Sequence, residues 1–95
     1  MRYDIILAPE AIVDLKRLKA HTRAEVQVAI ETHLRHEPTK FSKSRIKRLQ
    51  GLTRPQHRLR VGDMRVFYDA SENTVEILAI IEKSQAEEWL ERHER

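Results

Sequence analysis

The chain has 95 residues, of which 40% are hydrophobic and 35% charged, and it carries a formal net charge of +3. This length suits one modest hydrophobic core, so we expect a single domain over residues 1–95. The absence of cysteine excludes disulfides and thiolate metal sites, and no apolar run approaches the roughly 20 residues of a transmembrane helix.

The net charge hides an uneven distribution along the chain. Residues 40–65 contain nine Lys or Arg and one acidic residue, Asp63, whereas residues 70–95 contain seven Glu and three basic residues. A basic block on a small domain is typical of a nucleic-acid contact, although a solvated loop would have the same composition. The amino-terminal segment shows no signal-peptide pattern, so we expect a cytoplasmic protein with no membrane partner.

The first elements in chain order are a strand and two helices. Residues 3–7 read as a strand, and Pro9 suits the first turn of a helix whose apolar positions are Ile12, Leu15 and Leu18. A capping box at residues 22–25 predicts the start of a second helix. The apolar stripe of that helix comprises Val26, Ala29, Ile30, His33 and Leu34.

Pro38 marks the exit from the second helix, and the two helices are expected to form an antiparallel hairpin over one face of a sheet. His33 and His36 are spaced to share a metal ion. However, His33 belongs to the apolar stripe and no third ligand is evident, so we expect no metal and no cofactor.

A basic connection over residues 41–56 leads to the most informative stretch, residues 57–68. Two alternating runs flank Gly62-Asp63, a pair suited to a primed two-residue turn. The turn predicts four cross-strand pairs: Val61 with Met64, Arg60 with Arg65, Leu59 with Val66, and Arg58 with Phe67. Alternation then sends one set to the core (Leu59, Val61, Met64, Val66) and the other to the opposite face (Arg58, Arg60, Arg65, Phe67).

Arg60 opposite Arg65 is unusual because like charges directly opposite each other destabilise a sheet. An anionic ligand on that face is the simplest reason for the pair. Two alternatives remain open: Arg58 and Arg60 as solvated edge-strand charges, and Arg65 paired with a glutamate of the terminal helix. His57 is expected on the core side.

The remaining residues predict a strand and a short helix. Residues 69–73 read as a turn, residues 74–81 as a central strand, and residues 84–87 as a second capping box. The terminal helix has one apolar side, formed by Ala86, Trp89, Leu90 and His93. We therefore expect an α+β fold: a small antiparallel β-sheet packed against an N-terminal α-helical hairpin, with a short C-terminal helix.

Two patterns in this order resemble the RelE/ParE superfamily of bacterial toxins. They are the Leu-Arg-x-Gly-Asp-x-Arg-Val-x-Tyr hairpin at residues 59–68 and the Lys-Ser-x-Ala-x-x-Trp-Leu helix at residues 83–90. The resemblance covers nearly the whole chain. It implies a type II toxin. Members of the RelE-like branch cleave messenger RNA on the ribosome without a metal, and members of the ParE-like branch act on DNA gyrase. The arginines fit the RelE-like branch better.

The resemblance also implies roles for individual residues. Arg65 resembles the arginine that stabilises the phosphate, and the full set of expected catalytic residues is Arg58, Arg60, Arg65 and Lys83. The expected RNA-binding residues are Arg48, Phe67 and Trp89. Phe67 could instead pack under a neighbouring element, and Trp89 could anchor the last helix. Trp89 cannot transfer a proton, and no general base stands out.

The expected partners follow from the same resemblance. They are a cognate antitoxin protein, mRNA on the ribosome, and operator DNA only through the antitoxin complex. A non-toxic module that keeps only the antitoxin interface is a further alternative to the nuclease and to the gyrase inhibitor.

Overall fold

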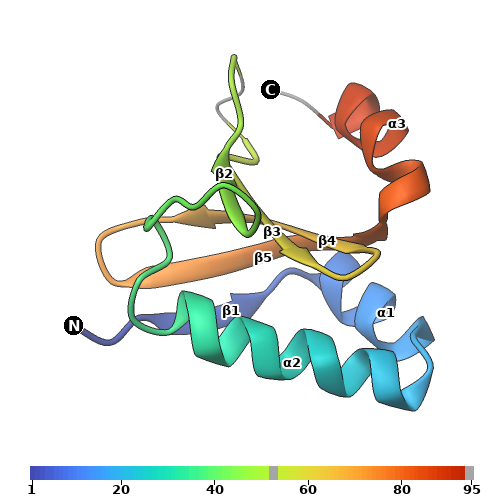
Figure 1. Ribbon diagram of the computed structural model, residues 1–95, viewed down its shortest axis with the longest axis horizontal. Helices are drawn as coiled ribbons and strands as arrows, with labels where there is room; N and C mark the ends of the chain where they lie inside the picture. The colour runs from blue at the N-terminus through green and yellow to red at the C-terminus, as the bar shows by residue number, and fades with distance from the viewer. Residues whose placement is uncertain (52–53, 94–95) are drawn as a thin grey trace.

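A five-stranded mixed sheet separates two N-terminal helices from a third helix in the computed structural model, which describes residues 1–51 and 54–93 (Figure 1). The strand order is β1-β5-β4-β3-β2. The elements in chain order are β1 (Asp4–Leu7), α1 (Pro9–Arg17), α2 (Ala20–Leu34), β2 (Ile46–Arg48), β3 (His57–Val61), β4 (Met64–Ala70), β5 (Thr74–Glu82) and α3 (Lys83–His93).

The expected α+β fold is confirmed, with two differences in the sheet. Three strand pairs are antiparallel, but β1 runs parallel to β5 and makes the sheet mixed. Parallel strands need a long connection, and here residues 8–73 lie between the two strands. The second difference is β2, a three-residue strand inside the connection expected to be irregular.

The core lies between the sheet and α2. Val26, Ile30 and Leu34 are buried on α2, as their helical spacing predicts, and they belong to the same apolar cluster as Leu59 and Val66. On α1 the sequence interpretation was wrong for one residue. Ile12 is 41% exposed, and Ala11, which is fully buried, takes its place on the inner side. Within the described ranges, no helix combines the length and the apolar character needed to cross a membrane.

Both predicted capping boxes are wrong. Helix α2 begins at Ala20, so Thr22 lies inside its first turn, and the N-cap Lys19 makes no side-chain capping bond. The contact at this corner comes from Arg23, which donates hydrogen bonds to the carbonyl oxygens of Leu15 and Leu18 and so satisfies the exposed end of α1.

Helix α3 likewise starts one residue before the predicted cap. It begins at Lys83, directly after β5, and Ser84 is therefore its second residue. The backbone N–H of Lys83 donates to the carbonyl oxygen of Asp63 at 2.7 Å. The start of α3 is thus bound to the turn between β3 and β4, which fixes where the terminal helix leaves the sheet.

The hairpin of β3 and β4 has the predicted register at all four cross-strand pairs. Gly62 adopts a φ of 57°, whereas no non-glycine residue among those described has a positive φ. A glycine with positive φ at the first turn position and an ordinary residue at the second is the pattern of a type II′ turn. The turn therefore sets the register, and the faces of the hairpin follow from it.

Asp14 closes a gap at the edge of the sheet. Strand β1 ends at Leu7, so the part of β5 beyond Ile77 has no strand beside it on that side. The Asp14 carboxylate on α1 accepts a hydrogen bond from the backbone N–H of Ile80 at 2.9 Å. A side chain here replaces the missing strand and ties α1 to β5.

We expect Asp14→Ala to lower the free energy of unfolding by about 1–3 kcal/mol, because it leaves a part-buried N–H without a partner. The matched control is Asp14→Asn, which keeps an acceptor oxygen and should lose less. Urea denaturation measures both variants. An alanine variant as stable as the unmodified protein would contradict this role of Asp14.

Candidate functional site

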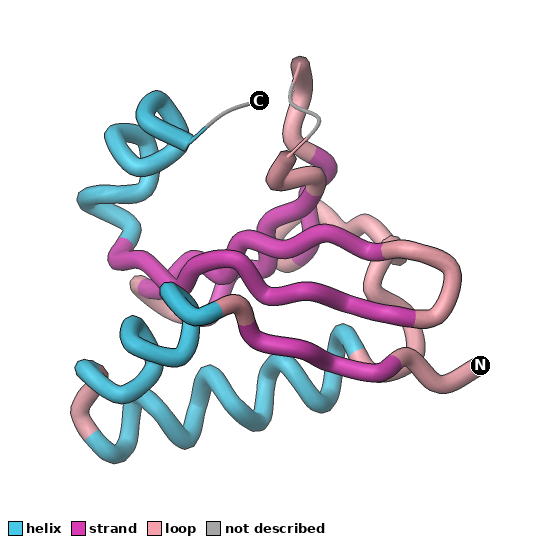
Figure 2. The backbone as a smooth tube through the Cα atoms, turned by 180° about the vertical axis from the view of Figure 1, so that it is seen from behind, coloured by secondary structure: helices cyan, strands magenta, loops and turns pink. Residues whose placement is uncertain are grey.

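The face of the sheet turned away from α1 and α2 carries a cluster of cations, which we call the arginine face: Lys47, Arg58, Arg60 and Arg65. Figures 1 and 2 show α1 and α2 on one side of the sheet and α3 on the other. Arg60 pairs with Arg65 across β3 and β4, and Lys47 pairs with Arg58 across β2 and β3. Directly paired residues share a face. Sequence reasoning missed Lys47 because it missed β2.

Arg65 is held rigidly within this face. The residue is only 7% exposed, and its Nη1 donates hydrogen bonds to the carbonyl oxygens of Gly62 at 2.9 Å and Met64 at 3.0 Å. Burial lowers the pKa of Arg65, and Arg60 lowers it further, while Asp63 opposes the shift. The guanidinium is therefore fixed in position by its own turn.

Arg58 lies in a similar environment. Burial lowers its pKa first, and the charges of Arg65 and Arg60 lower it further. Its Nε is buried and makes no hydrogen bond within the described ranges. A buried donor without an acceptor normally destabilises a protein by about 1–3 kcal/mol. A bound anion would supply the missing acceptor.

Among the described residues, no carboxylate forms an ion pair with the three arginines of this cluster. None of the ion pairs within residues 1–51 and 54–93 involves Arg58, Arg60 or Arg65, so the expected alternative of a glutamate from α3 on Arg65 is not found there. Arg58 and Arg60 are not on an edge strand, because β3 lies between β2 and β4, although the side chain of Arg60 is exposed. Three mutually repelling guanidiniums on one face favour an anionic ligand.

The two candidate aromatic residues pack against each other. Phe67 is 1% exposed and its ring stacks on Trp89 at a centroid distance of 5.0 Å and an angle of 6°. Trp89 also stacks on His93 at 4.3 Å and 10°. Phe67 thus packs under a neighbouring element, the second of its two expected roles. Trp89 contacts Phe67 and anchors α3 on the sheet.

Of the two remaining candidates, Arg48 lies on the opposite face of the sheet. It pairs with His57 across β2 and β3, so it shares the core-side face of His57, and its Nη1 approaches the carbonyl oxygen of Gln56 at 3.5 Å. Lys83 is exposed at the start of α3, beside a cavity of about 390 Å³ that is also lined by Asp63 and Glu82. Its backbone N–H is bonded to the turn that orients Arg65, and Arg65 pairs with Ile81, two residues before Lys83.

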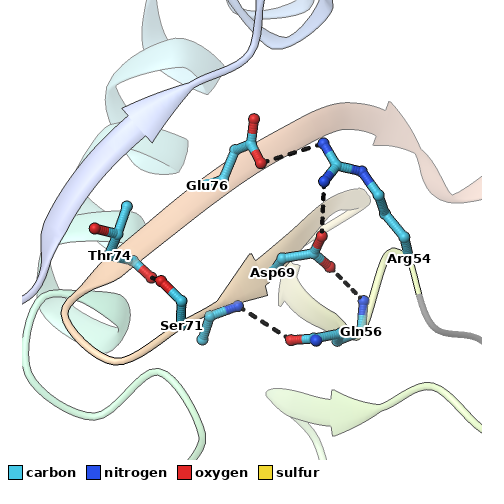
Figure 3. A network of polar contacts seen from close by, with 7 residues as sticks. Arg54, Gln56, Asp69, Ser71, Thr74 and Glu76 are labelled. Carbon is cyan, nitrogen blue, oxygen red and sulfur yellow. Dashed lines mark hydrogen bonds and ion pairs between the residues drawn. The ribbon is translucent and has the colours of Figure 1, made fainter.

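Arg54, in contrast, is neutralised by two carboxylates of the same protein (Figure 3). Its Nη1 lies 3.5 Å from an Asp69 oxygen and its Nη2 lies 3.2 Å from an oxygen of Glu76. The same Asp69 carboxylate accepts a 2.8 Å hydrogen bond from the backbone N–H of Gln56. The network fixes the approach to β3, and it makes Arg54 a compensated cation with which the arginine face can be compared.

His57 lies on the core side, as predicted. It is 5% exposed, and its ring stacks on Tyr68 at 5.2 Å and on Phe41 at 5.9 Å. Burial lowers the pKa of His57, Arg48 lowers it further, and Asp69 opposes the shift. His57 is therefore held neutral in the folded protein and cannot act on the arginine face.

We expect the free energy of unfolding to fall as the pH drops below about 6.5, the ordinary pKa of histidine. The unfolded chain then binds a proton at His57 more readily than the folded chain does, so acid favours unfolding. His57→Phe keeps the ring stack and removes the titrating group, so it should flatten this slope in denaturation curves between pH 5 and pH 8. His33, whose pKa burial also lowers, leaves a residual slope. Equal slopes in the two proteins would contradict the buried neutral state.

Comparison with known proteins identifies the fold and the family. The chain is similar to a chain in each of three solved structures. One is the RelB–RelE complex of Methanococcus jannaschii, with a TM-score of 0.69 and 20% identity over 88% of this chain and 96% of that one. The RelE–RelB complex of Pyrococcus horikoshii OT3 has a TM-score of 0.72 and 22% identity over 90% of this chain and 99% of that one. The RelBE2 complex of Mycobacterium tuberculosis has a TM-score of 0.70 and 24% identity over 86% of this chain and 99% of that one. Comparison with curated protein sequences gives no match.

A family model described as "ParE toxin of type II toxin-antitoxin system, parDE" matches residues 5–87. These matches confirm the resemblance to type II toxins and the fold expected from it. The chain belongs to the ParE toxin family, within the RelE/ParE superfamily.

Proposed function

We propose that this toxin is a metal-independent endoribonuclease that cleaves mRNA on the ribosome. The observation that carries the proposal is the arginine face, where Arg58, Arg60 and Arg65 gather without a carboxylate partner among the described residues. A phosphodiester is the anion that such a cluster fits, because guanidinium groups match pairs of phosphate oxygens. Action on the ribosome would place the protein in the cytoplasm.

The chemistry requires three events at one phosphate. The 2′-hydroxyl must lose its proton and attack phosphorus, the negative charge of the five-coordinate intermediate must be stabilised, and the 5′-oxygen must take up a proton as it leaves. Arg65 suits the second role because two backbone carbonyls hold it in place before substrate binds. Arg58 and Arg60 would bind the remaining phosphate oxygens.

Lys83 is the candidate donor of a proton to the leaving oxygen. Its backbone is bonded to the turn that also orients Arg65, so the two residues share one anchor. Lysine can transfer a proton, whereas arginine is charged at all ordinary pH values. The general base is not assigned to a residue in this proposal.

A second candidate function is inhibition of DNA gyrase. The family model that matches the chain is described for ParE toxins, and ParE-like members of the superfamily act on gyrase. In that case the arginine face would be a protein-binding or DNA-binding surface without catalysis. A third candidate, a non-toxic antitoxin-binding module, would keep the fold and lose both activities.

We also propose a cognate antitoxin as the protein partner. The similar solved structures named above are toxin–antitoxin complexes. An acidic, amphipathic segment that folds on binding would complement the arginine face and the exposed apolar surface of α1, where Ile12 and Val13 are 41% and 46% exposed. Operator DNA would be reached only through the complex with this antitoxin.

We expect Arg65→Met to lower the rate of RNA cleavage at least about 100-fold, as the loss of a transition-state donor does, and to abolish growth arrest on induction. The matched control is Arg54→Met, which removes an arginine that is already neutralised by Asp69 and Glu76. Sequencing of RNA ends after induction, and cleavage of mRNA on purified translating ribosomes, measure the effect. Thermal unfolding verifies that Arg65→Met is folded.

One outcome would contradict the role of the arginine face, and two others would contradict the nuclease activity itself. A folded Arg65→Met protein that still cleaves RNA would refute the role of the arginine face. Intact transcripts together with loss of gyrase supercoiling activity would favour the second candidate. Intact transcripts, normal supercoiling and tight antitoxin binding would favour the third.

A further inference from the structure

A second basic surface, which also carries an exposed aromatic ring, lies between the end of α2 and the loop before β2, away from the arginine face. We call it the Phe41 groove: a cavity of about 230 Å³ lined by residues of the end of α2 and of the loop before β2 (Thr32, His33, Glu37, Lys40, Phe41, Ser42, Arg45 and Ile46). Phe41 is 56% exposed, although it is a large aromatic residue. None of the roles proposed above uses this surface.

Phe41 is the outer ring of a stacked column. Its ring stacks on that of His57 at a centroid distance of 5.9 Å, and the His57 ring stacks on the fully buried Tyr68 at 5.2 Å. The Tyr68 hydroxyl donates to the carbonyl oxygen of Pro38 at 2.7 Å and so ties the column to the start of the loop. An aromatic ring that is held by a stacking neighbour and is still exposed to solvent is suited to stacking on a flat ligand.

The loop that carries Phe41 is internally bonded. The Ser42 hydroxyl accepts hydrogen bonds from the backbone N–H groups of Arg45 at 3.0 Å and Ile46 at 3.3 Å, and the Ser42 N–H donates to the carbonyl oxygen of Ile46 at 3.1 Å. These bonds close the loop on itself, so the ring and the neighbouring cations are held in place before any ligand binds.

The charges around the groove are mostly positive. Lys40, Lys43 and Arg45 are exposed on this loop, and the one acidic lining residue, Glu37, pairs with Lys40 at 3.6 Å. Burial and the charge of Arg45 lower the pKa of His33, which leaves it as a neutral hydrogen-bonding group in the wall of the groove. Cations beside an exposed aromatic ring are typical of surfaces that bind single-stranded nucleic acid.

We propose that the Phe41 groove binds an unpaired nucleotide of RNA outside the cleavage site, with its base stacked on Phe41 and its phosphate contacted by Arg45. This inference rests on the RNA-directed function proposed above. The unpaired nucleotide belongs either to the mRNA or to ribosomal RNA, since both present the same base and phosphate groups.

The backbone links the groove to the arginine face. The N–H of Arg60 donates to the carbonyl oxygen of Arg45 at 2.8 Å, and β2 follows directly with Lys47 on the arginine face. Three residues of strand span about 10 Å. An RNA strand that crosses the β2 edge can therefore contact the groove and the arginine face together.

The test measures RNA binding without cleavage. A fluorescent single-stranded RNA with 2′-O-methyl ribose cannot be cut through its 2′-hydroxyl, and its affinity for the purified toxin is read by anisotropy. We expect Phe41→Leu, which keeps an apolar cover over His57, to raise the Kd about 5- to 100-fold, whereas Phe41→Tyr keeps the aromatic ring and the affinity. The matched control, Val28→Ala, removes an apolar side chain that is 64% exposed on α2 and should change nothing.

A second arm uses cosedimentation of the same variants with ribosomes that lack mRNA. Weaker binding to the free RNA identifies mRNA as the ligand, and weaker binding to the empty ribosomes alone identifies ribosomal RNA; either result supports the proposal. Phe41→Leu bound normally in both arms would overturn it. The nuclease proposal is judged separately, because its failure would appear as intact transcripts after induction of the unmodified toxin and would leave these affinities unaffected.

Discussion

The register of the β3–β4 hairpin is the constraint on which the candidate site depends. Gly62, with a φ of 57°, closes a two-residue turn, and Leu59 and Val66 are fully buried on the core side. A slip of one residue would drive arginines into the core, so burial of one face fixes the other. Arg60 and Arg65 are therefore held opposite each other by apolar packing and not by any attraction between them.

This enforced proximity explains why the arginine face differs from the rest of the basic block. Arg54, on the approach to the same strand, is neutralised by Asp69 and Glu76. Burial lowers the pKa of Arg58 and of Arg65. The charges of Arg65 and Arg60 lower that of Arg58 further, and the charge of Arg60 lowers that of Arg65 further. A protein selected for stability alone would not keep this arrangement, whereas a phosphate-binding site gains from it, because a bound anion relieves the repulsion and supplies the acceptor that Arg58 Nε lacks.

The hairpin and its faces could be predicted because period-two alternation and a two-residue turn leave one register. The strand β2 could not, since three residues with Ile46 as the one apolar side chain give no periodic signal, and Lys47 was missed with it. The parallel β1–β5 pair joins opposite ends of the chain, which local patterns do not record. The starts of α2 and α3 were misplaced because Thr22 and Ser84 do not cap them. Arg23 binds the end of α1 beside the start of α2, and the Lys83 N–H binds the β3–β4 turn at the start of α3. The stack of Phe67, Trp89 and His93 likewise depends on where α3 leaves the sheet.

The central claim is that the arginine face binds a phosphodiester. The most direct test is to follow the arginine side-chain Nε–Hε resonances by NMR while an uncleavable 2′-O-methyl RNA is added to the toxin. The account predicts large shifts for Arg58 and Arg65, whose guanidiniums gain an acceptor, and little change for Arg54, which is already paired. RNA that binds while the signals of Arg58 and Arg65 stay in place would contradict the account.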